Sequence, residues 1–548
     1  MGSCDVGGAW TLLANGPGRP RVTGPVGTGT PVRLLRAFNK LVPRYPATAR
    51  VAVVLGFAGG SVGVVLAGVR WGGVAGIREL WWWPDAPAGI TRVGLHVNEV
   101  LDTTAQGLLL VSWVALGVLI RRGVAAVATV VWAAAAGGLP LLLGAPLFSN
   151  DAYTYVAVGS VLDHRLDPYR VGWGVLRDTS YAAHVDHTWQ HTPTPYSPVV
   201  LRVLQLDAHA VHGHLLPGVL LLRAAAVLGL LALGGAVAWA AGPRPGAVAT
   251  GLWVAVANPL MAQHLLSGVH IDLSIAVLVV LAVTFHARGH PVAATALVVL
   301  AAQVKITAAV VLLVLAADLA AGRTGRHRWV RGAPVLLGGA AAFTAISVGT
   351  GLGFGWLTAL SVPGRGGNSM TPVNAVADLA HRVGLGVRPL TNHVVSAPAG
   401  LRAASLLVGA AVVAWSVLAV RRLGVPLAAA ASLAALATFG TATWPWYFAP
   451  VLALVAVAGP SRRVLTAATL GSVVLAITLK PGSEPLLPHA PVLGDVATLA
   501  LLAGIVAILT RVGAGPAPGA RQPRDRRQLS SRRDPSRRRW RQPRVADA

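Results

Sequence analysis

Repeated apolar runs, many of them close to 20 residues long, constrain this 548-residue chain more than any other feature. A helix of about 20 apolar residues crosses the hydrocarbon of a bilayer, which is about 30 Å thick. Only 12% of the residues are charged, about half of the share typical of soluble domains, and the mean hydropathy is +0.64. Too few polar residues are present to cover a water-soluble globule. The sequence therefore predicts an all-α polytopic membrane protein.

About 14 apolar segments are expected to cross or enter the membrane, forming one bundle of about 13–14 transmembrane helices. They lie near residues 51–69, 106–120, 124–147, 216–241, 246–266, 270–286, 291–304, 305–321, 331–350, 401–420, 424–441, 445–458, 463–479 and 493–511. The stretch 291–321 is long for one span and short for two. We divide it near Gln303–Lys305 because this division keeps the later basic loops on one side of the membrane.

The net charge of +26 comes largely from arginines within Arg33–Arg50, within Arg521–Arg544 and in short loops between the apolar runs. Positive charge in short loops marks the cytoplasmic side of a membrane protein, and a basic tail can also contact anionic membrane lipid. The charge therefore indicates membrane topology, and no nucleic acid partner is expected. The strong preference for arginine over lysine suggests a GC-rich bacterial genome, and so a bacterial inner (cell) membrane.

This topology divides the chain into three parts. We predict a basic cytoplasmic N-terminal segment at 1–50, a transmembrane catalytic domain at 51–511 and a disordered basic cytoplasmic tail at 512–548. The main loops on the outer, extracytoplasmic side are then 70–105, 148–215 and 351–400.

The loop 148–215 concentrates acidic, aromatic, histidine and proline residues, whereas the rest of the chain is largely Ala, Val, Leu and Gly. Functional residues often lie on loops that a rigid scaffold positions. Asp151 directly follows an apolar span, so its carboxylate is expected to be partly desolvated and able to accept a proton from a sugar hydroxyl. Tyr153 and Tyr155 are typical of a sugar pocket. From the residues alone, Asp151 could equally be a helix cap, with the two tyrosines as interfacial anchors.

Two other parts of this loop are candidates for substrate contact. Asp167-Pro168-Tyr169 is typical of a turn, in which the acid could also be a cap. Trp189 and Tyr196 lie in or next to a proline-rich stretch, residues 193–198, which is stiff and extended. Such a segment suits a substrate wall, although a linker would have the same composition.

The histidines of the loop do not predict a metal centre. His184, His187 and His191, together with Asp186, are spaced for one face of a helix, but a proline follows at once and no ordered ligand motif emerges. No metal site is therefore predicted. No cofactor is assigned either, and a divalent cation stays open as an alternative.

Ionisable residues also occur near the predicted outer ends of later spans. His270 and Asp272, with His264 across a short turn, are expected to face a cavity because ionisable groups in lipid are costly. Lys305 is the one lysine inside the apolar bulk, and its ammonium could hold a lipid-linked phosphate. Arg365, in a glycine-rich segment, is a second phosphate-binding candidate or part of an ordinary flexible loop.

Three aromatic residues, Trp444, Trp446 and Tyr447, are expected at the outer interface. Aromatic side chains anchor helices at the membrane surface, and they also form the walls of sugar-binding sites. The residues alone do not decide between these two roles.

Six motifs occur in an order that resembles a known family. They are Phe148–Tyr155, Asp167–Tyr169, Trp189–Pro198, Asn258-Pro259, His270–Asp272 and Trp444–Tyr447. Together they resemble the actinobacterial polyprenol-phosphate-mannose-dependent α-1,6-mannosyltransferases, which have the multi-spanning GT-C fold. The resemblance covers roughly residues 50–510.

This resemblance implies a GT-C-like bundle and a lipid donor, β-mannosyl phosphopolyprenol. It implies a growing α-1,6 mannan on a lipid anchor, as in lipomannan, as the acceptor, and inversion at the anomeric carbon. Asp151 matches the acidic position of the family's first large outer-loop motif and is the expected base.

The chain departs from the family pattern at two positions. Ile271 stands where the family tends to have asparagine, and Ser197 where it tends to have glycine. The first change removes an amide that could bind a sugar, which puts the acceptor and linkage in doubt more than the reaction class. Two alternatives stay open: another polyprenyl-phosphate-sugar transferase, for instance one using arabinose, and a flippase or transporter of lipid-linked sugars.

Overall fold

The computed structural model describes residues 46–71, 95–321, 326–360, 370–384 and 397–478. The chain divides into two units, Met1–Ala49 and Arg50–Ala548, and the description below concerns the second. Throughout the described residues the regular secondary structure is helical. The predictions for the N-terminal segment, the tryptophans near 81–83, the span at 493–511 and the C-terminal tail lie outside the described residues.

Five described helices are long and apolar enough to cross a membrane. They are α2 (Pro46–Trp71), α4 (Leu95–Arg121), α9 (Leu215–Ala241), α14 (Arg326–Gly349) and α16 (Ala399–Leu418). A sixth candidate is a broken span in which the π-helix η3 (Met261–Ser267) meets α11 (Asp272–Ala287) at 114°. The architecture is that of an all-α polytopic membrane protein, and the number of about 13–14 crossings remains a prediction.

Shorter helices complete the bundle and the segments at its ends. They are α5 (Val127–Leu143), α6 (Asp151–Asp163), η1 (Trp173–Leu176), α7 (Thr179–His184), η2 (His187–Trp189), α8 (Pro198–Ala210), α10 (Pro245–Ala255), α12 (Pro291–Ala302), η4 (Ile306–Ala309), α13 (Val310–Ala320), η5 (Gly355–Ala359), α15 (Pro372–Arg382), α17 (Val420–Leu423), α18 (Val425–Phe439), η7 (Pro445–Phe448), α19 (Ala449–Val457) and α20 (Arg462–Ile477).

The segment 291–321 reverses direction near Lys305. Gly332, near the start of α14, faces Ala320 at the end of α13, so these two helices run antiparallel. Gln303, just past the end of α12, donates a hydrogen bond to Ser347 near the end of α14, so α12 runs parallel to α14. The predicted division of this stretch into two segments is therefore confirmed.

The predicted single span 246–266 is wrong. Helix α10 ends at Ala255, and the chain resumes as the π-helix η3 only after Asn258-Pro259. Proline has no backbone N–H to donate and disfavours the helical conformation in the residue before it, which ends α10 at this point. The Asn258 side chain stabilises the break by accepting from the Leu260 backbone N–H and donating to Ser472.

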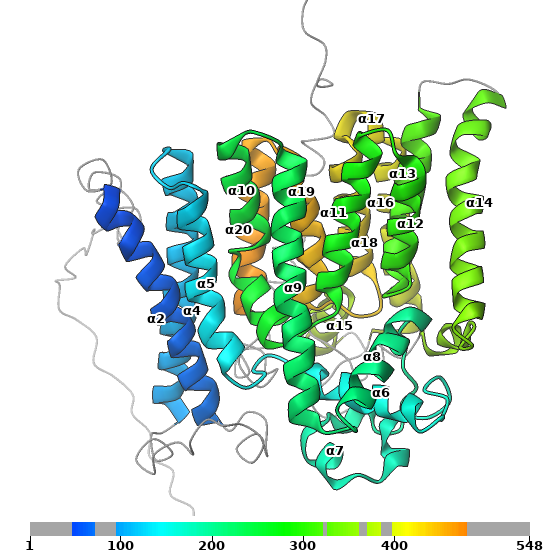
Figure 1. Cartoon of the computed structure of the whole chain (residues 1–548), viewed down its shortest axis with the longest axis horizontal. Helices are drawn as coiled ribbons and strands as arrows, with labels where there is room; N and C mark the ends of the chain where they lie inside the picture. The colour runs from blue at the N-terminus through cyan, green and yellow to red at the C-terminus, as the bar shows by residue number, and fades with distance from the viewer. Residues whose placement is uncertain (1–45, 72–94, 322–325, 361–369, 385–396, 479–548) are drawn as a thin grey trace, which may run out of the picture. The chain divides into compact units, whose positions relative to one another are not determined.

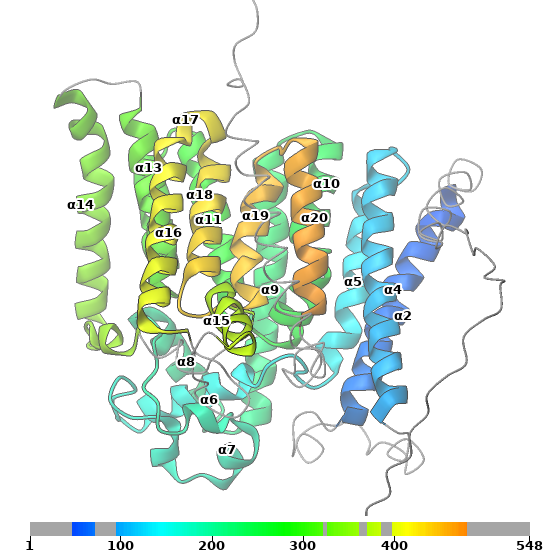
Figure 2. The same cartoon turned by 180° about the vertical axis from the view of Figure 1, so that it is seen from behind.

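The predicted outer loop 148–215 is an ordered cap of short helices. Figures 1 and 2 show α6, α7 and α8 gathered with α15 at one end of the long helices, and α17 at the other end. Helices α6 and α8 pack closely. Gly159 is needed at their contact because a Cβ there would overlap the Leu204 carbonyl.

A buried arginine joins three segments of the bundle beside the cap. Arg223 of α9 is 2% exposed, and its guanidinium donates to the carbonyls of Leu142 and Gly144 at 2.6 Å and of Ser267 at 3.2 Å. The first two carbonyls lie just before Asp151 in the chain, and the third ends η3. Arg223 therefore fixes the two chain segments that flank the candidate site.

Replacing Arg223 by methionine should destabilise the protein by about 3 kcal/mol, because three buried carbonyls lose a charged donor. Arg223→Lys should lose less, since one ammonium can still reach some of these carbonyls. Thermal unfolding in detergent measures both variants. Equal midpoints for wild type and Arg223→Met would contradict this role.

Asp207 on α8 is a buried acid with no hydrogen-bond partner for either carboxylate oxygen among the described residues. One of these oxygens lies beside Gly218, near the start of α9. Burial raises the pKa of this carboxyl from 3.8 to about 7.

This raised pKa predicts a pH dependence of stability. The unfolded carboxyl loses its proton at lower pH than the folded one, so stability falls as pH rises through the folded pKa. Between about pH 5 and about pH 8 the loss should be roughly 3 kcal/mol. Asp207→Asn should remove this decline in thermal unfolding measured across that range. Parallel curves for the two proteins would refute the prediction.

Candidate active site

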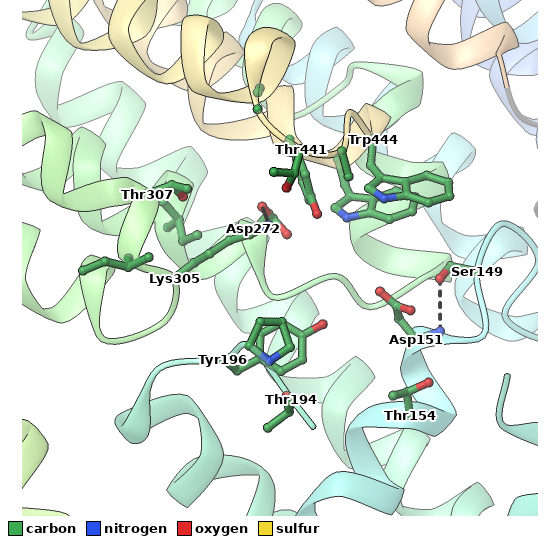
Figure 3. A pocket seen from close by; sticks show the side chains of 18 of the residues that line it. Ser149, Asp151, Thr154, Thr194, Tyr196, Asp272, Lys305, Thr307, Thr441 and Trp444 are labelled. Carbon is green, nitrogen blue, oxygen red and sulfur yellow. Dashed lines mark hydrogen bonds and ion pairs between the residues drawn. The ribbon is translucent and has the colours of Figure 1, made fainter. Parts of the chain in front are cut away.

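A cavity of about 350 Å³ lies where the cap meets the ends of the bundle helices (Figure 3). Its walls come from the start of α6, the stretch after η2, the start of α11, the reversal at Lys305, the end of α18 and η7. The predicted candidates that line it are Asp151, Tyr155, Trp189, Tyr196, Asp272, Lys305, Trp444, Trp446 and Tyr447. Segments far apart in sequence thus converge on one site.

Asp151 opens helix α6 and faces the cavity, with its side chain 23% exposed. Its backbone N–H donates to the Ser149 hydroxyl at 3.0 Å, the dashed contact in Figure 3. A carboxylate in the first turn of a helix is stabilised by the helix dipole. The start of α6 therefore places Asp151 at the cavity, with part of its side chain accessible to a ligand.

Lys305 lies on the other side of the cavity in the view of Figure 3. Its ammonium is 3.4 Å from a carboxylate oxygen of Asp272 and 3.4 Å from the centre of the Tyr447 ring. The Lys305 side chain is 21% exposed and that of Asp272 is 5% exposed. This cation is held by an acid and an aromatic face but remains accessible from the cavity.

Stacked rings form a third wall. Trp444 and Trp446 stack at 4.9 Å between ring centres, with planes 10° apart. Behind them the imidazole of His270 stacks on Trp446 at 3.7 Å, again with planes 10° apart. Flat apolar ring faces beside a carboxylate and a cation suit a sugar ring, which has apolar C–H faces and polar edges.

Tyr155 and Tyr196 stand edge to face at 5.7 Å on the cap side of the cavity. Burial raises the pKa of both hydroxyls well above the ordinary value, and nearby Asp151 adds to this effect. Both hydroxyls therefore stay neutral, so they can hydrogen-bond a ligand but cannot serve as a base. The Tyr169 hydroxyl donates to the Tyr196 carbonyl at 2.9 Å and supports this wall from behind.

Several predicted substrate-binding residues do not line the cavity. Tyr153 is fully buried and faces His184 instead. Asp167 is exposed in a turn, where it accepts from the Tyr169 backbone N–H and pairs with Arg170. Tyr169 and His270 lie behind the walls, as described above. Arg365, the second predicted phosphate contact, lies outside the described residues.

Other polar residues of the cavity were not predicted as site residues. They are Ser149, Asn150, Thr154, Asp186, Thr192, Thr194, Thr307 and Thr441. Asp186 was considered only as a metal ligand, and Thr307 and Thr441 lie in no motif. Ser149, Asn150, Thr154, Thr192 and Thr194 lie within the quoted motifs, but no role was assigned to them. No group of three or more His, Cys, Asp or Glu with metal-binding geometry occurs in the part of the chain that the structure describes.

An acid, a cation and stacked rings at the helix ends of a membrane protein suit an enzyme that handles a sugar. The family of α-(1→6)-mannopyranosyltransferase N-terminal domains matches residues 53–321. α-(1→6)-Mannopyranosyltransferase A of Mycobacterium tuberculosis is 30% identical over 411 residues, which cover 71% of this chain and 77% of that protein. The enzyme of the same name from Corynebacterium glutamicum is 26% identical over 389 residues, 67% of this chain and 79% of that protein. No solved structure matches the chain.

The chain belongs to the α-(1→6)-mannopyranosyltransferase family. It is therefore a glycosyltransferase of the mannosyltransferase class, as the order of its motifs predicted.

The Lys305–Asp272 pair predicts a coupled effect on stability. Lys305→Met should destabilise the protein by about 3 kcal/mol because it leaves the buried Asp272 carboxylate unpaired. Adding Asp272→Asn should recover most of that loss, since the amide carries no charge to compensate. Unfolding of the two single variants and the double variant in detergent measures the coupling, and additive losses would contradict it.

Proposed function

We propose that this enzyme transfers mannose from a polyprenyl-phosphate-mannose donor to a lipid-anchored mannan acceptor. The proposed linkage is α-1,6, formed with inversion from a β-linked donor on the outer face of the membrane. The observation that carries the proposal is the placement of one acid, Asp151, and one cation, Lys305, on opposite sides of a single aromatic-walled cavity.

Asp151 and Lys305 suit the attacking group and the leaving group of a single displacement at the anomeric carbon. The acceptor 6-hydroxyl attacks the anomeric carbon, and Asp151 takes the proton of that hydroxyl as the new C–O bond forms. The bond from the anomeric carbon to the phosphate oxygen breaks, and its electron pair leaves with the lipid phosphate. Attack from the face opposite the phosphate converts a β-linked donor into an α-linked product.

Lys305 is suited to the leaving phosphate. As the bond breaks, the phosphodiester monoanion becomes a phosphate monoester dianion, so negative charge develops at one place. Lys305 is accessible from the cavity and is already held by Asp272 and Tyr447, so little reorganisation is needed when that charge appears. Preorganised charge of this kind is commonly a large contribution to catalysis. Because phosphate is a stable leaving group, the mechanism needs no general acid.

The arrangement of the ends of the helices supports an outer-face site. Arginines cluster at the end of α4, at the end of α11, in α17 and at the start of α20. Figure 1 shows α17 at the end of the bundle opposite the cap. Because positive charge marks the cytoplasmic side, the cap and its cavity would face outwards.

The family favours mannosyl transfer over the alternatives, and the names of the relatives support an α-1,6 linkage. The position of the cavity also bears on the choice between an enzyme and a flippase. A transporter is expected to hold its polar groups near the midplane of the bilayer. Here they gather where the cap meets the helix ends, which favours transfer at an interface. An arabinosyl donor remains the alternative enzyme.

Asp151→Asn should lower the transfer rate about 10³-fold, because the amide cannot accept the proton of the acceptor hydroxyl. The assay uses membranes containing the full-length chain, radiolabelled polyprenyl-phosphomannose and a short α-1,6-mannoside acceptor. Asp163→Asn is the matched control: it lies at the far end of the same helix, pairs with His209 outside the cavity, and should keep the wild-type rate.

Wild-type turnover by Asp151→Asn would overturn the assignment of the base. Labelled arabinose from polyprenyl-phosphoarabinose in the product, with no mannose transferred, would overturn the proposed donor instead.

A further inference from the structure

His270, which lies outside the cap, contacts Asp151. Its Nδ1 lies 3.4 Å from the Asp151 Oδ2. His270 lies in the sharp bend between η3 and α11, and its side chain is 0% exposed. His270 does not line the cavity, so any effect on the substrate would have to pass through Asp151.

The His270 ring has little freedom to turn. One face stacks on Trp446 at 3.7 Å, and Trp446 in turn stacks on Trp444. The imidazole of His264 packs nearby, 6.2 Å away between ring centres. This packing restrains the ring, whose Nδ1 lies 3.4 Å from one oxygen of Asp151.

A carboxylate base works best when one oxygen is held and the other is free. An unrestrained carboxylate rotates about its Cβ–Cγ bond and spends part of its time misaligned with the acceptor hydroxyl. A donor on Oδ2 removes this rotation and leaves Oδ1 for the proton, and misplacement of a reacting group by about 1 Å can cost about 10²-fold in rate.

We propose that His270 is a positioning residue for the transfer reaction. It presents an Nδ1–H to Oδ2 of Asp151 and so orients this base towards the acceptor hydroxyl. This inference rests on the proposed function. The 3.4 Å contact is longer than a formed hydrogen bond, as is common at catalytic groups before the substrate arrives, and we expect it to shorten in the ternary complex.

The charged and titratable groups around His270 are few. Asp151 faces it from α6 and His264 from η3, while η7 contributes the aromatic face of Trp446. Asp272, two residues after His270, pairs with Lys305 at 3.4 Å. Among the described residues, the Asp151 carboxylate is therefore the group placed to accept a hydrogen bond from the His270 Nδ1–H.

His264 provides a matched control. Like His270 it is a fully buried histidine that packs near Trp446, at 5.5 Å between ring centres, but no contact joins it to Asp151. Both of its ring nitrogens lack a hydrogen-bond partner among the described residues. Phenylalanine should therefore replace His264 without loss of a polar contact or of activity.

The test is a double-mutant cycle in the full-length chain, with the same mannosyl transfer assay. His270→Phe keeps a flat ring against Trp446 but removes the N–H. It should lower kcat about 10- to 100-fold while leaving KM for donor and acceptor within about twofold. His270→Asn places an amide N–H near the lost Nδ1, so it should recover part of the rate. His264→Phe should match wild type.

The decisive measurement is His270→Phe in the Asp151→Asn background. If His270 acts through Asp151, the second change should alter the residual rate by less than about twofold. A further loss as large as in the wild-type background, or a full rate for His270→Phe alone, would overturn the inference. Either result would leave the proposed function standing, because the proposed function is tested separately by mannose transfer in the wild-type enzyme. A wild type that transfers no mannose overturns both.

Discussion

Hydrocarbon offers peptide groups no hydrogen-bonding partner, and the whole arrangement of this enzyme follows from that constraint. Within the bilayer the chain must be helical, so polar chemistry is confined to the places where helices end or break. His270 lies in the bend between η3 and α11, and Lys305 follows the break at Gln303–Lys305. Asp151 stands where the chain leaves α5 for the cap. The groups of the cavity are therefore products of helix termination, held by contacts such as those of Arg223.

Much of this could be predicted from the sequence, because the apolar runs and the basic loops carry strong signals. The all-α polytopic class and the reversal at Lys305 follow from these signals. The convergence of Asp151, Asp272, Lys305 and the Trp444–Tyr447 aromatics follows from their predicted places at the outer ends of the spans. The family likeness then gave a chemical role to an acid that the residues alone left open between base and helix cap.

Other features depended on local geometry that a one-dimensional pattern does not contain. Tyr153 and Tyr155 have similar neighbours in the sequence, yet a helix turns about 100° per residue. Tyr155 is four residues after Asp151 and shares its face, whereas Tyr153 is two residues after it and points away. In the same way, the span predicted from hydropathy, 246–266, includes Asn258-Pro259, although the helix is interrupted there. The place of His270 behind Trp446 follows from the separate 114° bend between η3 and α11, which hydropathy does not predict.

In the proposed reaction, one cavity brings the acceptor hydroxyl to Asp151 and the lipid phosphate to Lys305. A structure of the full-length enzyme in a lipid nanodisc with a non-hydrolysable polyprenyl-phosphonate analogue of the donor tests this claim directly. We expect the phosphonate oxygens within hydrogen-bonding distance of the Lys305 ammonium, and the sugar against the Trp444 and Trp446 wall with its anomeric carbon towards Asp151. A donor bound at the α17 end of the bundle, or one whose phosphonate avoids Lys305, would contradict it.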